Sequence, residues 1–141
     1  MKDGIQRSFH ENGALAGEVT LVNGLPNGIT KLWHPNGVLA DEIPVKDGVV
    51  EGIAKQWNDQ GELLGSYEIR NGSGVQKLWY PNGRLQGEIS LVDGKWTGRQ
   101  RAWFDDGTLV SETFWIENEE VSRKKYLEAC KSNSKLPVYD D

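Results

Sequence analysis

A short motif recurs five times along this chain at an almost constant spacing, and no other feature constrains the fold as strongly. It consists of a glycine, four residues, a large aromatic residue, three residues, a second glycine, one residue and a leucine. The copies begin 24, 24, 22 and 24 residues apart, at Gly4, Gly28, Gly52, Gly74 and Gly98. A period of this length is typical of repeat proteins, whose units pack only on their neighbours. Recognition of another macromolecule is therefore the first function to consider.

Each copy of the motif predicts a β-hairpin. In the second copy, residues 29–33 are rich in β-branched and aromatic side chains, and Pro35-Asn36-Gly37 follows with the chemistry of a tight turn. The pattern predicts a three-residue loop with a glycine bulge, and a return strand over residues 39–45. The chain is thus predicted to be an all-β repeat protein, a single-layer antiparallel meander of about five hairpins and ten strands over residues 1–118. The shorter third step predicts a tighter connection at residues 71–74.

The predicted loop also determines which residues share a face of the sheet. It pairs Trp33 with Leu39, Lys31 with Asp41 and Ile29 with Ile43, so one face carries aromatic, leucine, aliphatic and basic rows. Opposite the basic residues it places small or acidic side chains, namely Gly17, Asp41, Gly65, Gly87 and Ser111. The other face is predicted to be more polar and to include the recurring acidic residues Glu18, Glu42, Glu88 and Glu112.

These rows have two interpretations each. The aromatic row is predicted to form the core, because a single-layer sheet has no second layer to bury it; the alternative is an open docking stripe. The basic row either packs its aliphatic stems between the aromatic rings or contacts an acidic protein surface or lipid headgroup. The candidate partner-binding stripe combines the two rows: Arg7, Lys31, Trp33, Lys55, Trp57, Lys77, Trp79, Arg101 and Trp103.

Composition narrows the class of partner. The formal net charge of −5 argues against nucleic acid, which binds clustered Lys and Arg. It also disfavours an anionic bilayer, although the basic row keeps lipid contact as an alternative. Cys130 is the single cysteine, so an internal disulfide is excluded and no cysteine cluster indicates zinc. The first residues form no apolar leader and no apolar run approaches the ~20 residues of a membrane span, which predicts a cytoplasmic protein.

The sequence offers little support for catalysis. His10 and His34 fall in turns of separate repeats, and neither lies near a suitable nucleophile. The Asn-Gly and Asp-Gly elements lie between strands rather than before helices, so they are not phosphate-binding loops. We therefore expect no enzymatic activity, no cofactor and no metal.

The C-terminal segment departs from the repeat. The period stops after Ile116, and residues 117–121 are predicted to be a polar linker. Ser122 is a predicted N-cap for a helix that ends at Lys131, and residues 136–139 are predicted to be an extended tail. Residues 119–141 are expected to cap the open edge of the last repeat. The alternative is a tail that becomes ordered only on meeting a partner.

Residues 28–39 (GITKLWHPNGVL) and 74–85 (GVQKLWYPNGRL) resemble the bacterial MORN-variant repeat. The resemblance covers roughly residues 4–116, although a single Trp often replaces the usual Tyr pair. Proteins built wholly of this repeat are commonly labelled YwqK-type antitoxin components. The resemblance implies a non-catalytic hairpin array that acts by binding protein.

The leading hypothesis is an antitoxin or immunity-type protein whose protein partner is a cognate toxin. The alternative is a scaffold that contacts acidic lipid headgroups or organises an assembly. Homo-oligomers that join through edge strands remain a further option.

Overall fold

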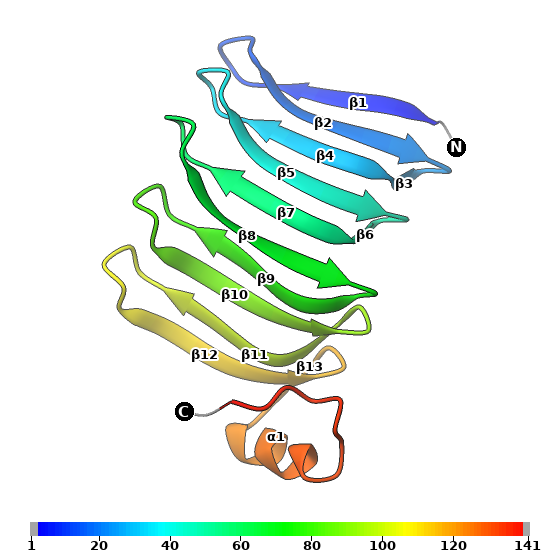
Figure 1. The fold of residues 1–141 in the computed structure, drawn as a ribbon, viewed down its shortest axis with the longest axis vertical. Helices are drawn as coiled ribbons and strands as arrows, with labels where there is room; N and C mark the ends of the chain where they lie inside the picture. Colours follow the sequence, from blue (N-terminus) through cyan, green and yellow to red (C-terminus); the bar gives the residue numbers. More distant parts are fainter. Residues whose placement is uncertain (1–2, 140–141) are drawn as a thin grey trace. The chain divides into compact units, whose positions relative to one another are not determined.

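The computed structural model describes residues 3–139, which form antiparallel β-hairpins followed by one short C-terminal helix (Figure 1). This confirms the predicted all-β repeat fold. The chain divides into two compact units, the first ending at Ile69 and the second beginning at Arg70. The division lies next to the shortened third step of the repeat. The predicted division into residues 1–118 and 119–141 stays a prediction.

The first unit is a sheet in the order β1-β2-β4-β5-β7-β8, with β3 and β6 as short additions to β2 and β5. Its strands are β1 (Gly4–Phe9), β2 (Leu15–Val22), β3 (Leu25–Pro26), β4 (Gly28–Trp33), β5 (Leu39–Lys46), β6 (Val49–Val50), β7 (Gly52–Trp57) and β8 (Leu63–Arg70). The second unit has the order β9-β10-β11-β12-β13. Its elements are β9 (Ser73–Trp79), β10 (Leu85–Val92), β11 (Lys95–Trp103), β12 (Leu109–Ile116), β13 (Glu119–Val121) and the helix α1 (Arg123–Cys130).

The loops that close the hairpins have the predicted geometry. The Gly37 N–H donates to the His34 carbonyl at 2.9 Å, and the His34 N–H donates to the Val38 carbonyl at 2.8 Å. Gly37 has a φ of 89°, a conformation that glycine adopts without steric cost. The Asn36 side chain completes the turn by accepting from the Val38 N–H at 3.0 Å. Proline, asparagine and glycine therefore act in this turn as their chemistry predicts.

The turns at the other end of the hairpins are two-residue turns with positive φ at both positions. Asn23 and Gly24 are one such pair, with φ of 53° and 78°, as expected for a type I′ turn. In the first unit a short strand and a separate residue, such as β3 and Asn27, precede the next long strand. After Asn71 and Gly72, by contrast, β9 begins directly at Ser73. This confirms the predicted tighter connection.

Each return strand contains a β-bulge, and the predicted register is wrong because of it. Trp33 pairs with Leu39 as expected, but the register then shifts and Leu32 pairs with Asp41. Lys31 pairs with Glu42 rather than Asp41. Ala40 is the additional residue. Because side chains alternate between faces, a shift of one residue moves the rest of the return strand to the opposite face.

The same bulge recurs in every hairpin and changes the composition of both faces. The predicted small or acidic partners of the basic row (Gly17, Asp41, Gly65, Gly87 and Ser111) pair instead with the neighbouring residues Ser8, Leu32, Gln56, Leu78 and Ala102. The acidic series, predicted for the other face, therefore lies on the face of the basic row. We call this face the charge face. Ile43, predicted for this face, moves to the other one because it pairs with Thr30.

The aromatic row is not the core, which corrects the sequence-based interpretation. Phe9 is 63% exposed, and Trp33, Trp57, Trp79 and Trp103 are each only half-buried. Equivalent strands lie two strand spacings apart, about 10 Å, beyond the ~7 Å at which aromatic rings interact. The buried apolar residues of the described chain are instead Ala40, Ala54, Ile69, Phe114, Tyr126 and Leu136.

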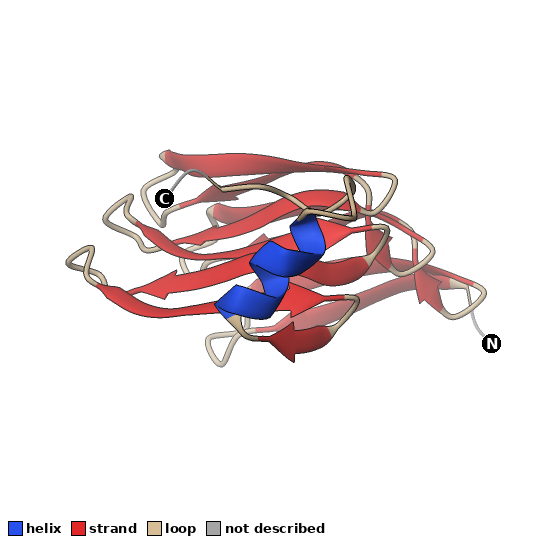
Figure 2. Cartoon of the chain, turned by 90° about the horizontal axis from the view of Figure 1, so that it is seen from below, coloured by secondary structure: helices blue, strands red, loops and turns tan. Residues whose placement is uncertain are grey.

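The C-terminal segment completes a buried apolar cluster of Phe114, Tyr126 and Leu136. Residues 119–121 are not a linker but the strand β13, which pairs with β12 through Phe114 and Val121. Ser122 then caps α1 (blue in Figure 2), as predicted, by accepting from the Lys125 N–H at 3.1 Å. The segment after α1 is not an open tail, because Leu136 packs with Phe114 and Tyr126. The predicted cap therefore covers β12 through both its helix and its extended part.

Tyr126 is the centre of this cap. Its side chain is fully buried, and its hydroxyl donates to the Pro137 carbonyl at 2.7 Å. We expect Tyr126→Ala to lower the free energy of unfolding by about 3–5 kcal/mol through the cavity it leaves. Tyr126→Phe should cost about 1–2 kcal/mol through the lost hydrogen bond. Urea unfolding measures both values. Leu127→Ala on the exposed side of α1 is the control, and an effect as large as that of Tyr126→Ala would contradict the assignment.

Candidate protein-binding face

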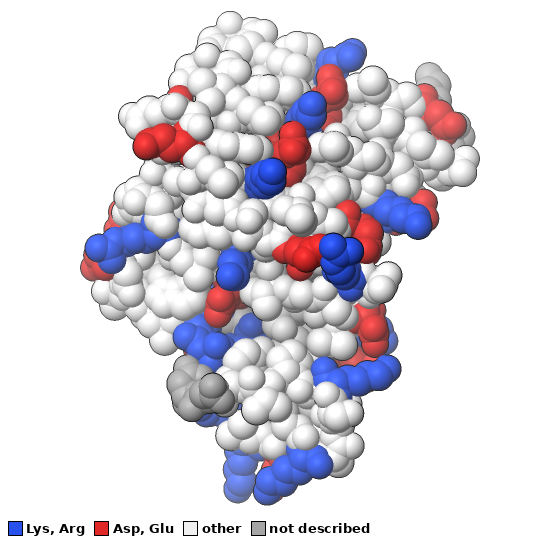
Figure 3. Space-filling model, in the orientation of Figure 1, with Lys and Arg blue, Asp and Glu red and all other residues white. Residues whose placement is uncertain are grey.

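Charged residues of alternating sign form a line across the first unit. Arg7 pairs with Glu18, Glu18 with Lys31, Lys31 with Glu42 and Glu42 with Lys55 across four strand pairs. The Arg7 Nε lies 3.1 Å from the Glu18 Oε2. Figure 3 shows this line in its upper part as blue and red groups in alternation. Each acidic residue therefore lies between two basic ones. We call this alternating line the charge ladder.

The second unit carries the same charge ladder, and the cap completes it. Lys77 pairs with Glu88, and Arg101 lies between Glu88 and Glu112. The Arg101 Nε is 3.8 Å from the Glu88 Oε1 and 3.1 Å from the Glu112 Oε2. On the far side of Glu112, its Oε1 lies 3.2 Å from the Arg123 Nη1. Arg123, from the first turn of α1, thus occupies the place of a further basic residue.

The nine residues of the candidate stripe lie on the charge face of their respective units. The guanidinium of Arg101, 6.0 Å from the Trp103 ring centroid, confirms that basic and aromatic residues share this face. The basic row is not a positive stripe, however. Neighbouring carboxylates neutralise it, with Ser66 as the exception opposite Lys55. The recurrence of an acidic residue at one position of the repeat was visible in the sequence (Glu18, Glu42, Glu88 and Glu112). The face on which these residues lie was not predictable, because it depends on the bulge.

An exposed isoleucine row borders the charge ladder in the first unit. Ile5, Ile29 and Ile53 are 52%, 50% and 53% exposed, and each precedes a basic residue of the ladder by two positions. Since residues two apart on a strand share a face, the row and the ladder run side by side. Half-exposed isoleucines in a periodic line are a typical protein-binding feature. The row was predicted as aliphatic, but its exposure required the structure.

In the second unit, the C-terminal segment covers the part of this surface around β11 and β12. Arg99 replaces the isoleucine on β11, and its guanidinium lies 3.9 Å from the centroid of the Tyr139 ring. The Arg99 backbone N–H donates to the Tyr139 hydroxyl at 2.9 Å. Phe114 is 5% exposed beneath Tyr126 and Arg123. On β9, by contrast, Val75 takes the place of the isoleucine and is 37% exposed.

The turn histidines have a structural role. The Nε2 of His10 lies 2.7 Å from the Trp33 carbonyl, and that of His34 lies 2.9 Å from the Trp57 carbonyl. A carbonyl accepts hydrogen bonds, so each Nε2 carries the proton. In the second unit, the Tyr80 hydroxyl makes the equivalent bond to the Trp103 carbonyl at 2.8 Å. These side chains connect successive hairpin loops.

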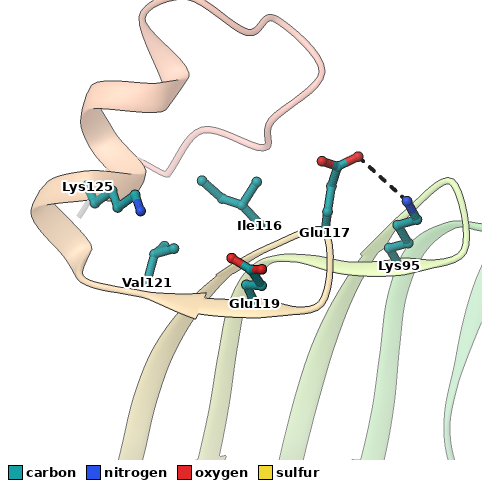
Figure 4. Close-up of a pocket in the computed structure, with 6 residues that line it drawn as sticks. All are labelled: Lys95, Ile116, Glu117, Glu119, Val121 and Lys125. Carbon is teal, nitrogen blue, oxygen red and sulfur yellow. Dashed lines mark ion pairs between the residues drawn. The ribbon is translucent and has the colours of Figure 1, made fainter.

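A pocket lies where the cap meets the last hairpin turns. It is lined by Lys95, Ile116, Glu117, Glu119, Val121 and Lys125 (Figure 4). The Lys95 Nζ lies 3.7 Å from the Glu117 Oε1, so two of its charged groups pair with each other. The lining residues include no serine, threonine, cysteine or histidine. Within residues 3–139 there is also no cluster of three metal-ligating side chains, and no helix is long and apolar enough to cross a bilayer.

One partly buried carboxyl lies on the face opposite the charge ladder. Asp41 pairs with Leu32 and Gln56, and burial raises the pKa of its carboxyl above the ordinary 3.8, an effect that nearby His34 opposes. Burial also raises the pKa of the Tyr67 phenol, and the charge of Asp41 adds to that shift. The ionised form of Asp41 is thus disfavoured in the folded state.

The raised pKa of Asp41 predicts a pH dependence of stability. Its contribution is fully present below the unfolded pKa and is lost as the pH rises through the folded pKa. Asp41→Asn should therefore raise the urea midpoint relative to the native chain at pH 7, and the difference should shrink near pH 3.5. Asp59→Asn in an exposed turn is the matched control. If the difference in urea midpoint did not change with pH, the raised pKa of Asp41 would be refuted.

The second-unit charge ladder gives a test of pair strength. Arg101 is 19% exposed between two carboxylates, whereas Arg7 is 51% exposed beside one. We expect Arg101→Gln to lower the free energy of unfolding by about 1–2 kcal/mol, and Arg7→Gln by less than about 0.5 kcal/mol. Guanidinium-free unfolding in urea avoids screening by the denaturant. Equal losses for both variants would contradict the greater strength that we expect for the ion pairs of Arg101.

Comparison with known proteins agrees with the hairpin geometry. The MORN repeat variant matches residues 2–23, 26–47 and 73–93. No curated protein and no solved structure matches the chain. Repeats of this kind generally bind proteins or membranes. The chain thus contains three repeats that match the MORN repeat variant, within a longer series of periodic hairpins.

Proposed function

We propose that the chain is a non-catalytic protein-binding repeat protein that holds a partner on the charge face of its first unit. The observation that carries this proposal is the isoleucine row, whose three side chains are half-exposed beside an alternating charge ladder. The isoleucines supply apolar area to bury. The charges specify how the partner aligns, because complementary potentials select orientation and register.

The cap of the second unit indicates what a partner on this face would present. There, Tyr139 lies over the residue that replaces the isoleucine, and Arg123 pairs with a ladder glutamate. Aromatic and arginine side chains are also the residues that contribute most to protein interfaces. A partner with an aromatic side chain over the isoleucine row and a basic side chain near Glu18 or Glu42 fits this surface.

Neutralisation of a toxin is the specific role we propose, in the manner of an antitoxin or immunity protein in the cytoplasm. Such a protein acts by occupying its partner and needs no catalytic group. The basic residues of the ladder would have to attract acidic lipid headgroups in the alternative scaffold role. Lys31 lies opposite Glu18 and Glu42, and these carboxylates offset its positive charge. The ladder therefore favours a protein partner over a lipid surface.

The test uses a toxin candidate encoded beside this gene. Co-expression should restore growth, and the two proteins should co-purify. Ile29→Asp with Ile53→Asp should weaken binding at least about a hundredfold, because both place a charge in a desolvated interface. Leu127→Asp, at a residue of similar exposure on α1, should leave binding unchanged.

Two outcomes would overturn the proposal. Equal growth rescue by the double isoleucine variant and by the native chain would remove the charge face as the binding surface. Co-sedimentation with acidic liposomes that is lost when Lys31, Lys55 and Lys77 become Glu would favour the scaffold role. Circular dichroism of each variant separates lost binding from lost folding.

A further inference from the structure

Strand β1 forms an open edge of the first unit. Within residues 3–139, no strand lies along its outer side, and all six of its residues are exposed. A free edge strand presents unpaired backbone N–H and C=O groups that can pair with another chain. Natural proteins usually block such edges with a bulge, a proline or an inward charge. In β1 the single irregularity lies at its end, between Ser8 and Phe9.

The last repeat of the second unit, in contrast, is covered by the short strand β13, which pairs with β12 where a sixth repeat would begin. Glu120-Val121-Ser122-Arg123 follows Gly98-Arg99-Gln100-Arg101 by 22 residues and begins as the strand β13. At Ser122, where the other copies continue as a strand, the side chain caps α1 instead. After Val121 the chain therefore forms the capping helix α1 in place of a longer strand. Nothing equivalent covers β1 within the described residues.

Arg7 has an incomplete set of ladder partners. Lys31 lies between Glu18 and Glu42, and Arg101 lies between Glu88 and Glu112. Among residues 3–139, Glu18 is the ladder carboxylate that pairs with Arg7 at the edge, and the Arg7 side chain is 51% exposed. A strand that continued the repeat along β1 would place an acidic residue directly opposite Arg7. Opposite-charge pairs in that position stabilise strand pairing, and like charges oppose it.

We propose that the outer edge of β1 binds an extended segment of a partner protein as an additional antiparallel strand, with an acidic side chain opposite Arg7. A second copy of β1 does not supply this chemistry, because Gly4–Phe9 contains no acidic residue. Antiparallel pairing of two β1 strands brings two arginines into one row. The site is distinct from the isoleucine row, since it uses backbone groups and Arg7.

The chain itself provides the sequence of a suitable probe. In β2, Gly17 and Glu18 pair with Leu32 and Lys31, which are the repeat equivalents of Ser8 and Arg7. A fluorescently labelled peptide of residues 14–22 (ALAGEVTLV) therefore carries Glu18 in the correct register. A second peptide with Glu18→Lys tests charge. Fluorescence anisotropy with the full chain measures the affinity of each.

The native chain should bind the first peptide about tenfold more tightly than the Glu18→Lys peptide, given the size of cross-strand charge pairs. Arg7→Glu should reverse this preference. Lys124→Glu, which changes an exposed basic residue of α1, should leave the preference unchanged. Hydrogen exchange should show new protection in β1 when the first peptide is added.

Backbone methylation tests the strand pairing itself. Only alternate amides of an added strand donate to the edge, so N-methylation of one alternate set should abolish binding, whereas methylation of the other set should be tolerated. An equal effect of both sets, or a peptide preference that ignores Arg7, overturns the proposal, as does the absence of binding at millimolar peptide.

Sedimentation of the native chain and of the Arg7→Glu variant tests whether a second copy of this chain occupies the β1 edge instead. A concentration-dependent dimer that Arg7→Glu abolishes would assign the edge to a second copy and so overturn the partner strand. A monomer in both cases agrees with the proposal. Failure of any of these tests leaves the isoleucine row untouched, because the variants at Ile29 and Ile53 report on the face alone.

Discussion

A single additional residue in each return strand determines what the two faces of this protein carry. The bulge after each three-residue loop leaves the aromatic–leucine pair in place and moves the following residues across the sheet. The glutamates therefore pair with the basic residues on the charge face. Small residues such as Gly17 pair with residues of the opposite face. At Gly17 a Cβ atom would lie 3.1 Å from the Leu32 side chain, so glycine permits close packing there. The charge ladder is thus a consequence of backbone geometry.

A single-layer sheet has few ways to bury apolar surface, and this chain forms a buried apolar cluster at its cap. Tyr126 is fully buried and Phe114 and Leu136 nearly so, whereas Ile5, Ile29 and Ile53 of the first unit remain half-exposed. The charge face is therefore covered at the last repeat of the second unit and exposed along the isoleucine row of the first. The cap shows which side chains can pack on this face, because Arg123 forms an ion pair with Glu112 and Tyr139 stacks on Arg99. The binding function that we propose for the first unit depends on this exposed row.

Much of the local structure was predictable because it depends on residues near in sequence. Pro35, Asn36 and Gly37 specify their turn through φ preferences and one side-chain hydrogen bond. The N-cap at Ser122 follows from the same kind of local chemistry. Within each unit the basic and aromatic residues of the candidate stripe share a face, since alternation along an outgoing strand needs no knowledge of its partner. The role of the histidines was not predictable, because each bonds to a carbonyl 23 residues away.

The sequence by itself determined the repeat, the hairpin loops and the membership of the basic and aromatic rows, all of which depend on spacing and short-range backbone preference. Only the tertiary structure decided which residues face the basic row, because one bulged residue reverses the face of everything after it. It also decided that the tryptophans of the aromatic row are only partly buried and that residues 119–139 form a strand and a packed cap. These outcomes depend on strand register and on contacts between distant residues, and neither is encoded in the spacing of a motif.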